Sequence, residues 1–142
     1  MIALFLAAAA AQPDCDKLKG ALAQDQCLLA QSMALDPPPN CENQLTQFDM
    51  NVCSYRDFLR TDLDLNRSWE AAATKARADG AEFKRLLSAQ RKWIAYRDAQ
   101  CLLEAGPREG SGTIWALIQN SCMEKLAKSR IVELREFVEP KN

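Results

Sequence analysis

The sequence predicts an all-α fold, an antiparallel helical hairpin plus a third helix that form a disulfide-stabilised bundle, with a short N-terminal helical extension. Apolar residues recur at helical spacing over long stretches, and no segment alternates as a strand does. Six cysteines follow an apolar N-terminal run. Apolar residues make up 48% and charged residues 26% of the 142 residues, which suits one domain with one ordinary core.

The charge balance and the absence of histidine exclude several classes of function. Lys and Arg number 18 and Asp and Glu number 19, so the net charge is −1 with both signs interspersed. This gives no basic footprint for nucleic acid and no basic block for a membrane surface. Without His, Ser-His-Asp and Cys-His catalysis are excluded and the commonest metal ligand is missing. We therefore expect no catalytic residue, no metal and no cofactor.

The N-terminal segment predicts export. Residues 2–11 form an uninterrupted apolar run that is only about half the roughly 20 residues needed to cross a bilayer. The run is typical of a secretory signal with an Ala-rich cleavage site, and a buried helix segment is the alternative. We interpret residues 1–11 as a signal peptide, residues 12–40 as the helical extension with a Pro-rich linker, and residues 41–142 as the main helical domain. The mature protein would be periplasmic or secreted, without a membrane span.

Breaks and caps predict where the first helices begin and end. Residues 17–35 are rich in Ala, Leu and Gln, and the helix that they predict ends at Pro37–Pro39, because consecutive prolines cannot continue a helix. Thr46 is the expected N-cap of the first long helix, with Asp49 placed three residues on for a capping box. No Pro or Gly interrupts this helix before Gly80.

Two further helices follow Gly80. The second long helix is predicted over residues 81–105 and stops at Gly106-Pro107, a strong break. The third begins after the Gly-rich residues 110–113 and continues to about Val138. Helices of this length are unusual in a globular protein and favour a rod-like bundle.

The cysteines predict a disulfide framework. An even number behind an export signal is typical of an oxidising compartment, and free thiols in a cytosolic protein are the alternative. A disulfide requires two Cα atoms within about 7 Å of each other. The six cysteines are Cys15, Cys27, Cys41, Cys53, Cys101 and Cys122.

Helix geometry reduces the number of possible pairings. Twelve residues of straight helix separate two Cα atoms by about 18 Å, so Cys41 can reach Cys53 only from a segment before the first long helix. By the same reasoning, Cys15 can reach Cys27 only if the helix breaks between them, for example at Gly20. Both pairs are therefore permitted under these conditions.

The remaining cysteines are assigned from their positions around the predicted turn. Cys53 lies 27 residues before Gly80 and Cys101 lies 21 after it, and this offset of six residues is about 9 Å along the helix axis. A bond between them would distort the hairpin. Cys101 and Cys122 flank the Gly-rich connection instead, so we expect them to pair.

Polar residues interrupt the apolar stripes of the predicted hairpin. Asp62 lies 18 residues before Gly80 and Arg97 lies 17 after it, so we predict an internal ion pair between them. Asn66 and Gln90 would satisfy the remaining donors and acceptors. We expect this network to fix the register of the two helices. A catalytic carboxylate at Asp62 is the alternative, and no second poised carboxylate or nucleophile accompanies it in the sequence.

Three groups of residues together resemble a known family. They read Cys41-x-Asn43-x-x-Thr46-Gln47-x-x-Met50-Asn51-x-Cys53, then Asp62-x-x-Leu65-Asn66 with Gln90-Arg91-x-Trp93-Ile94-x-Tyr96-Arg97-Asp98-x-x-Cys101, then Gly110-Ser111-Gly112 with Cys122, Arg130 and Leu134. The combination resembles the LprI-like lysozyme-inhibitor family. Two positions depart from its pattern, Trp69 in place of Tyr and Ala127 in place of Thr. The resemblance implies an exported, non-enzymatic helical protein whose partner is lysozyme or another envelope protein.

A candidate partner-binding loop follows from this resemblance. Lysozyme works with two carboxylates in an open cleft, so a blocking protein needs hydrogen-bond donors on a protruding loop. Residues 106–113 offer Arg108 and Ser111, and a Cys101–Cys122 bond would preorganise them. An ordinary glycine-rich helix connection is the simpler interpretation. A structural or interaction module of the cell envelope without lysozyme activity is the alternative function.

Overall fold

The computed structural model describes residues 12–140, and this part of the chain contains helices and no strand. The all-α prediction is therefore confirmed, while the predicted signal peptide, residues 1–11, lies outside the described residues. The elements are the 3₁₀ turn η1 (Cys15–Lys17), α1 (Ala21–Met33), α2 (Gln47–Ala76), α3 (Gly80–Ala105) and α4 (Trp115–Val138).

The helix boundaries follow local signals. Gly20, with φ of 92°, separates η1 from α1 in a backbone conformation that favours glycine. The helix predicted over residues 17–35 is therefore shorter than expected and covers Ala21–Met33. At the start of α2, the Asp49 amide donates to Thr46 Oγ1 at 3.0 Å and the Thr46 amide donates to Asp49 Oδ2 at 3.3 Å, which completes the predicted capping box. Asp79 caps α3 by accepting a hydrogen bond from the Ala81 amide at 2.8 Å.

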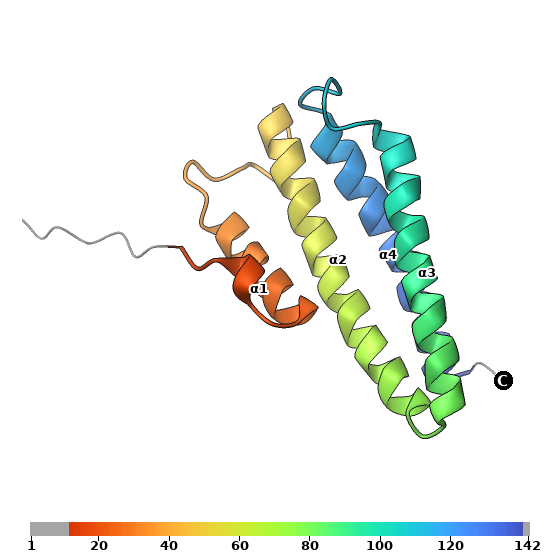
Figure 1. Ribbon diagram of the computed structural model, residues 1–142. Coiled ribbons are helices and arrows are strands. Elements are labelled where there is room, and N and C mark those ends of the chain that lie inside the picture. The colour runs from red at the N-terminus through yellow and green to blue at the C-terminus, as the bar shows by residue number, and fades with distance from the viewer. Residues whose placement is uncertain (1–11, 141–142) are drawn as a thin grey trace, which may run out of the picture.

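The three long helices form the bundle (Figure 1). Helices α2 and α3 are antiparallel, and α4 returns behind the gap between them. Helix α4 packs extensively against both, whereas α2 and α3 touch each other much less. The hairpin is therefore held together largely through α4, and α1 packs against α2 at the side of the bundle.

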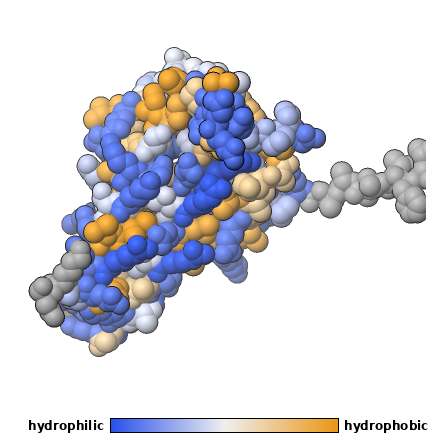
Figure 2. Space-filling view, turned by 180° about the vertical axis from the view of Figure 1, so that it is seen from behind, coloured by the Kyte–Doolittle hydropathy of each residue, from blue (hydrophilic) through white to orange (hydrophobic). Residues whose placement is uncertain are grey.

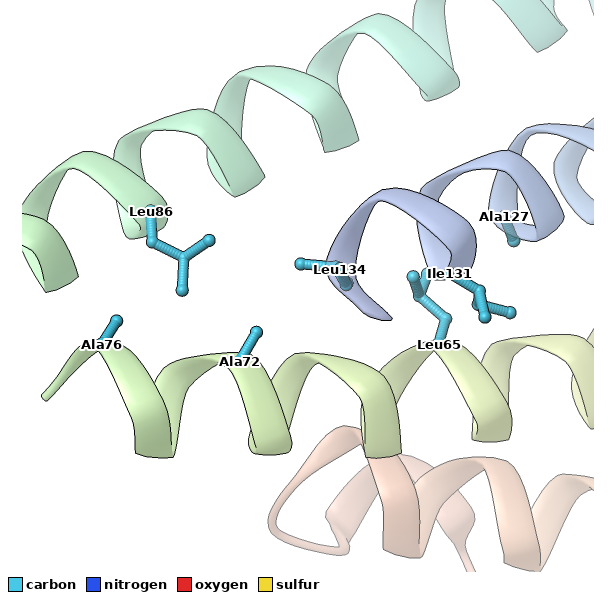
Figure 3. Packing of buried hydrophobic residues seen from close by; sticks show 7 residues of the cluster. All are labelled: Leu65, Ala72, Ala76, Leu86, Ala127, Ile131 and Leu134. Carbon is cyan, nitrogen blue, oxygen red and sulfur yellow. The ribbon is translucent and has the colours of Figure 1, made fainter. Parts of the chain in front are cut away.

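The hydrophobic core lies where the three long helices meet. Figure 3 shows its side chains pointing from α2, α3 and α4 into one shared space. Small alanines on α2 let α4 and α3 approach closely, and branched side chains from those helices fill the space. The cluster comprises Leu65, Ala72, Ala76, Leu86, Ala127, Ile131 and Leu134.

The three disulfides join the pairs that we expected. Their Cα–Cα distances are 5.6 Å for Cys15–Cys27, 5.6 Å for Cys41–Cys53 and 5.5 Å for Cys101–Cys122, all within the usual range. The break at Gly20 lets Cys15 fold back onto α1. The second bond ties the segment before α2 to that helix, and the third joins the end of α3 to α4. Each bond therefore clasps a helix start or a turn.

Replacing the buried Leu134 tests the position of the core. The side chain of Leu134 is 1% exposed, so Leu134→Ala should lower the free energy of unfolding by about 2–5 kcal/mol through lost burial and a residual cavity. Urea denaturation followed by far-UV circular dichroism measures this loss. Val132 lies on the same helix but is 52% exposed, so Val132→Ala should cost less than about 1 kcal/mol. Equal losses would contradict the placement of the core.

Candidate functional site

Arg97 joins α3 to α2 near the middle of the bundle. Its Nη1 lies 3.6 Å from Asp62 Oδ1, and the two side chains are 14% and 16% exposed. Arg97 also binds Asp98, the next residue on α3, through Nη2 at 2.9 Å. Asp62 of α2 and Arg97 of α3 are therefore level with each other, as expected from their nearly equal distances in sequence from Gly80.

A second carboxylate lies beside Asp62. Asp25 of α1 is only 8% exposed and is hydrogen-bonded to the Asp62 carboxyl group. Asn66 Nδ2 donates to Asp25 Oδ2 at 2.9 Å and to Asp62 Oδ2 at 3.4 Å. The expectation that no second carboxylate accompanies Asp62 is therefore wrong, because α1 packs against α2 and brings Asp25 to this position.

The carboxyl pair has an unusual protonation equilibrium. Burial raises the pKa of Asp25 from 3.8 to about 7, and the charge of Asp62 and its hydrogen bond act in the same direction. Asn66 and the positive charge of Arg97 oppose this rise. Burial and the charge of Asp25 also raise the pKa of Tyr55 on α2. Near neutral pH, Asp25 is therefore divided between its protonated and ionised forms.

The residue spacing within α1 contains a signal for Asp25 that the long helices do not provide. Leu22, Asp25, Leu29 and Ser32 follow one another at spacings of three and four residues, so they share one face of α1. Of these, Asp25 and Ser32 are buried. A carboxylate on the apolar face of a short helix indicates a polar partner on the surface that the helix covers.

Arg56 of α2 provides a second polar attachment for α1. Its side chain is 7% exposed, and Nη2 donates to the carbonyl oxygen of Ser32 at 2.5 Å, in the last turn of α1. The free carbonyl groups at a helix C-terminus attract a cation. Nε of Arg56 has no hydrogen-bond partner among the described residues. Helix α1 is thus held at its middle by Asn66 and at its end by Arg56.

Gln90 does not join the Asp62 pair. Arg130 of α4 donates to Gln90 Oε1 at 2.9 Å, and Gln90 is 8% exposed. Gln90 lies two turns before Arg97 on α3, about 10 Å away along the axis, where α4 faces α3. The expectation that Gln90 completes the hydrogen bonds of Asp62 and Arg97 is therefore wrong, and its partner comes from α4.

Trp93 links these two groups of polar contacts. The guanidinium of Arg97 lies 5.3 Å from the centroid of the indole ring and that of Arg130 lies 5.9 Å from it. Each is a cation–π contact worth about 0.5–1 kcal/mol where water has access. We call the whole set the polar network, and it draws on all four α-helices. Its members are Asp25, Asp62, Asn66, Gln90, Trp93, Arg97 and Arg130.

The geometry of the carboxyl pair favours a structural role over catalysis. A general acid–base pair needs a position beside both groups that a substrate can reach. Asp25 is almost completely buried under α1, and its oxygens are occupied by Asp62 and Asn66. The pair therefore joins helices, and α1 covers it.

The predicted partner-binding loop is anchored at both ends. Trp115 Nε1 donates to the Gly106 carbonyl at 2.9 Å, and Asn51 Nδ2 of α2 donates to the Thr113 carbonyl at 2.8 Å. Gly106, Gly110 and Gly112 have positive φ angles, which favour glycine. Together with the Cys101–Cys122 bond, these contacts define the path of residues 106–113.

The two candidate side chains of this loop take part in its own contacts. The guanidinium of Arg108 lies 4.9 Å from the centroid of the Trp115 ring, and Ser111 Oγ donates to the Pro107 carbonyl at 2.5 Å. Arg108 remains exposed, whereas Ser111 is half-buried. Arg108 is therefore the side chain of the two that a partner can reach more easily.

Two further features concern membranes and metals. Within residues 12–140, no helix combines the length and apolar character needed to cross a membrane. The same part of the chain holds no group of three or more side chains suited to bind a metal ion. On the face seen in Figure 2, hydrophobic side chains lie in separate patches between hydrophilic ones.

Removing the positive charge of Arg97 tests the polar network. Arg97→Met keeps a long apolar stem but leaves Asp62 beside Asp25 without a counter-charge, so the free energy of unfolding at pH 7 should fall by about 1–3 kcal/mol. Lys92→Met, at an exposed position of the same helix, should change it by less than about 0.5 kcal/mol. Urea denaturation compares the two variants, and an equally small change would show that Arg97 does not stabilise the network.

Comparisons with known proteins agree with the residue pattern. The model of the family described as "Lysozyme inhibitor LprI" matches residues 40–134. A protein of Rhizobium meliloti (strain 1021), described as uncharacterized, is 31% identical over 124 residues, which cover 80% of this chain and 88% of that protein. No solved structure matches the chain. Because the family match extends over more than half of the sequence, the chain belongs to the LprI lysozyme-inhibitor family.

Proposed function

We propose that the protein is an exported lysozyme inhibitor that acts by binding the enzyme and has no catalytic activity of its own. The match of residues 40–134 to the family carries this proposal, since it spans α2, α3 and most of α4. Three disulfides are typical of an oxidising compartment and support a periplasmic or secreted location. In this proposal residues 1–11 are the signal peptide, and residues 12–40 precede the inhibitor domain.

The loop over residues 106–113 is the part of the protein that we propose to contact lysozyme. Lysozyme carries two carboxylates in an open cleft, which a guanidinium group can approach and neutralise. Arg108 is exposed on a loop whose ends are fixed by Trp115 and Asn51. A loop that is ordered before binding loses little conformational entropy when it binds, which favours affinity.

A second candidate function is an envelope interaction module without lysozyme activity. Exposed apolar side chains on α3 favour it, since Tyr96 and Leu103 lie seven residues apart on one face of the helix and are 55% and 77% exposed. Large apolar side chains gathered on a surface often mark a protein interface. The net charge of −1 adds no strong long-range attraction toward a basic enzyme, so it does not favour lysozyme over another partner.

A lysozyme assay with the purified, disulfide-bonded protein tests the proposal. The wild-type protein should inhibit hydrolysis of bacterial cell walls, and Arg108→Glu should weaken inhibition by about tenfold or more, because a carboxylate would face the carboxylates of the cleft. Lys84→Glu makes the same change in charge at an exposed position on α3, far from the loop along the helix, and should inhibit like the wild type.

The outcomes separate the two candidate functions. Absence of inhibition by the wild-type protein at high micromolar concentration would remove the lysozyme proposal and leave the interaction module. Inhibition that Arg108→Glu and Lys84→Glu leave equally unchanged would keep lysozyme as the partner but exclude the loop as the contact.

A further inference from the structure

The side chains that α1 buries most fully in the bundle are polar. Its only buried residues are Asp25 and Ser32, and it contributes none of the residues of the hydrophobic core cluster. Leu22, Leu28 and Leu29 are only half-buried. Its attachment therefore depends strongly on the two contacts that bury polar groups, from Asn66 to Asp25 and from Arg56 to the Ser32 carbonyl.

The covalent structure allows α1 to separate from α2. The Cys15–Cys27 disulfide closes within the extension, and the bonds Cys41–Cys53 and Cys101–Cys122 lie within the following domain. Only the backbone of residues 34–40 connects α1 to that domain. Helix α1 also lies before residue 40, outside the segment that matches the family. Helix α1 can therefore leave the following domain without breaking a disulfide.

The charged and polar groups that face Asp25 or its neighbours come from η1, α2 and α3. Helix α2 contributes Asp62, Asn66 and Tyr55, and α3 contributes Arg97. Arg97 is already shared between Asp62 and Asp98, while Asp16 of η1 adds a negative charge near Tyr55. An ionised Asp25 would thus face Asp62 with only one shared guanidinium to compensate, whereas a protonated Asp25 can donate a hydrogen bond to Asp62.

We propose that α1 is a pH-dependent cover over the polar face of α2, docked when Asp25 is protonated and released when Asp25 ionises. Release would expose Arg56, Asp62 and Asn66 on α2, which are the side chains that contact α1. The guanidinium of Arg56 and the carboxylate of Asp62 would then become accessible to solvent. In acidic surroundings the same surface stays covered.

The sign of the pH dependence follows from the two states of Asp25. Its pKa is about 7 in the docked state and has the ordinary value of 3.8 when α1 is released. Since the docked state holds the proton more tightly, docking is strongest below pH 4, weakens as the pH rises, and has lost this contribution above pH 7. Between pH 5 and pH 8 the ratio of docked to released protein should fall by about tenfold or more.

Hydrogen exchange of the full chain measures this equilibrium. The backbone amides of residues 21–33 are followed by mass spectrometry at pH 5, 6, 7 and 8, and each rate is divided by the intrinsic rate at that pH. The protection factors of α1 should fall about tenfold or more over this range, while those of α2 and α4 in the core stay constant. In Asp25→Asn, which cannot ionise, the protection of α1 should not depend on pH.

Two controls keep the result interpretable. Asp16→Asn removes one carboxylate from the same extension at an exposed position and should keep the pH dependence of the wild type. Infrared spectroscopy of the unaltered protein should detect a protonated carboxyl group that ionises near pH 7, a signal absent from Asp25→Asn. Protection of α1 that is constant with pH in the wild type, or that falls equally in Asp25→Asn, would overturn the proposal.

Discussion

The arrangement of the helices around the polar network depends on the contacts of the Arg97 guanidinium. This group pairs with Asp62, lies over Trp93, and lowers the pKa of Asp25 on α1. Two carboxyl groups could not be buried side by side without a positive charge or a shared proton to offset their repulsion. Arg97 supplies the charge and Asp25 holds the proton, so Asp25 of α1 can lie beside Asp62 of α2.

The helix boundaries could be predicted from the sequence because the signals that set them are local. Thr46 with Asp49, the prolines after α1 and Gly106 act within a few residues of the helix end that they define. The packing partner of each helix was less predictable. Hydrophobic periodicity shows that a helix has a buried face, but it does not identify the helix that packs there. In this protein α2, with alanines such as Ala72 in the core, packs more extensively against α4 than against α3.

The candidate site was predictable only where both partners belong to the hairpin. Counting residues from Gly80 placed Asp62 level with Arg97, since an antiparallel turn relates the two positions directly. Asp25 was not predicted from the sequence, and Gln90 was given the wrong partner, because the turn does not determine where α1 and α4 lie. The fold of α1 onto α2 brings Asp25 in, and the return of α4 gives Gln90 its contact with Arg130.

The disulfides and the polar network stabilise different parts of the bundle. The disulfides clasp helix starts and turns, which leaves the middle of the long helices to be aligned by side chains. Neutralising Asp62 would have two opposing effects there, because it would lose the pairing with Arg97 but also relieve the repulsion with Asp25. An unchanged stability of Asp62→Asn would therefore not contradict a role in register. Neutralising Arg97 removes attraction from both carboxylates, so its effect on stability has one sign and measures the network directly.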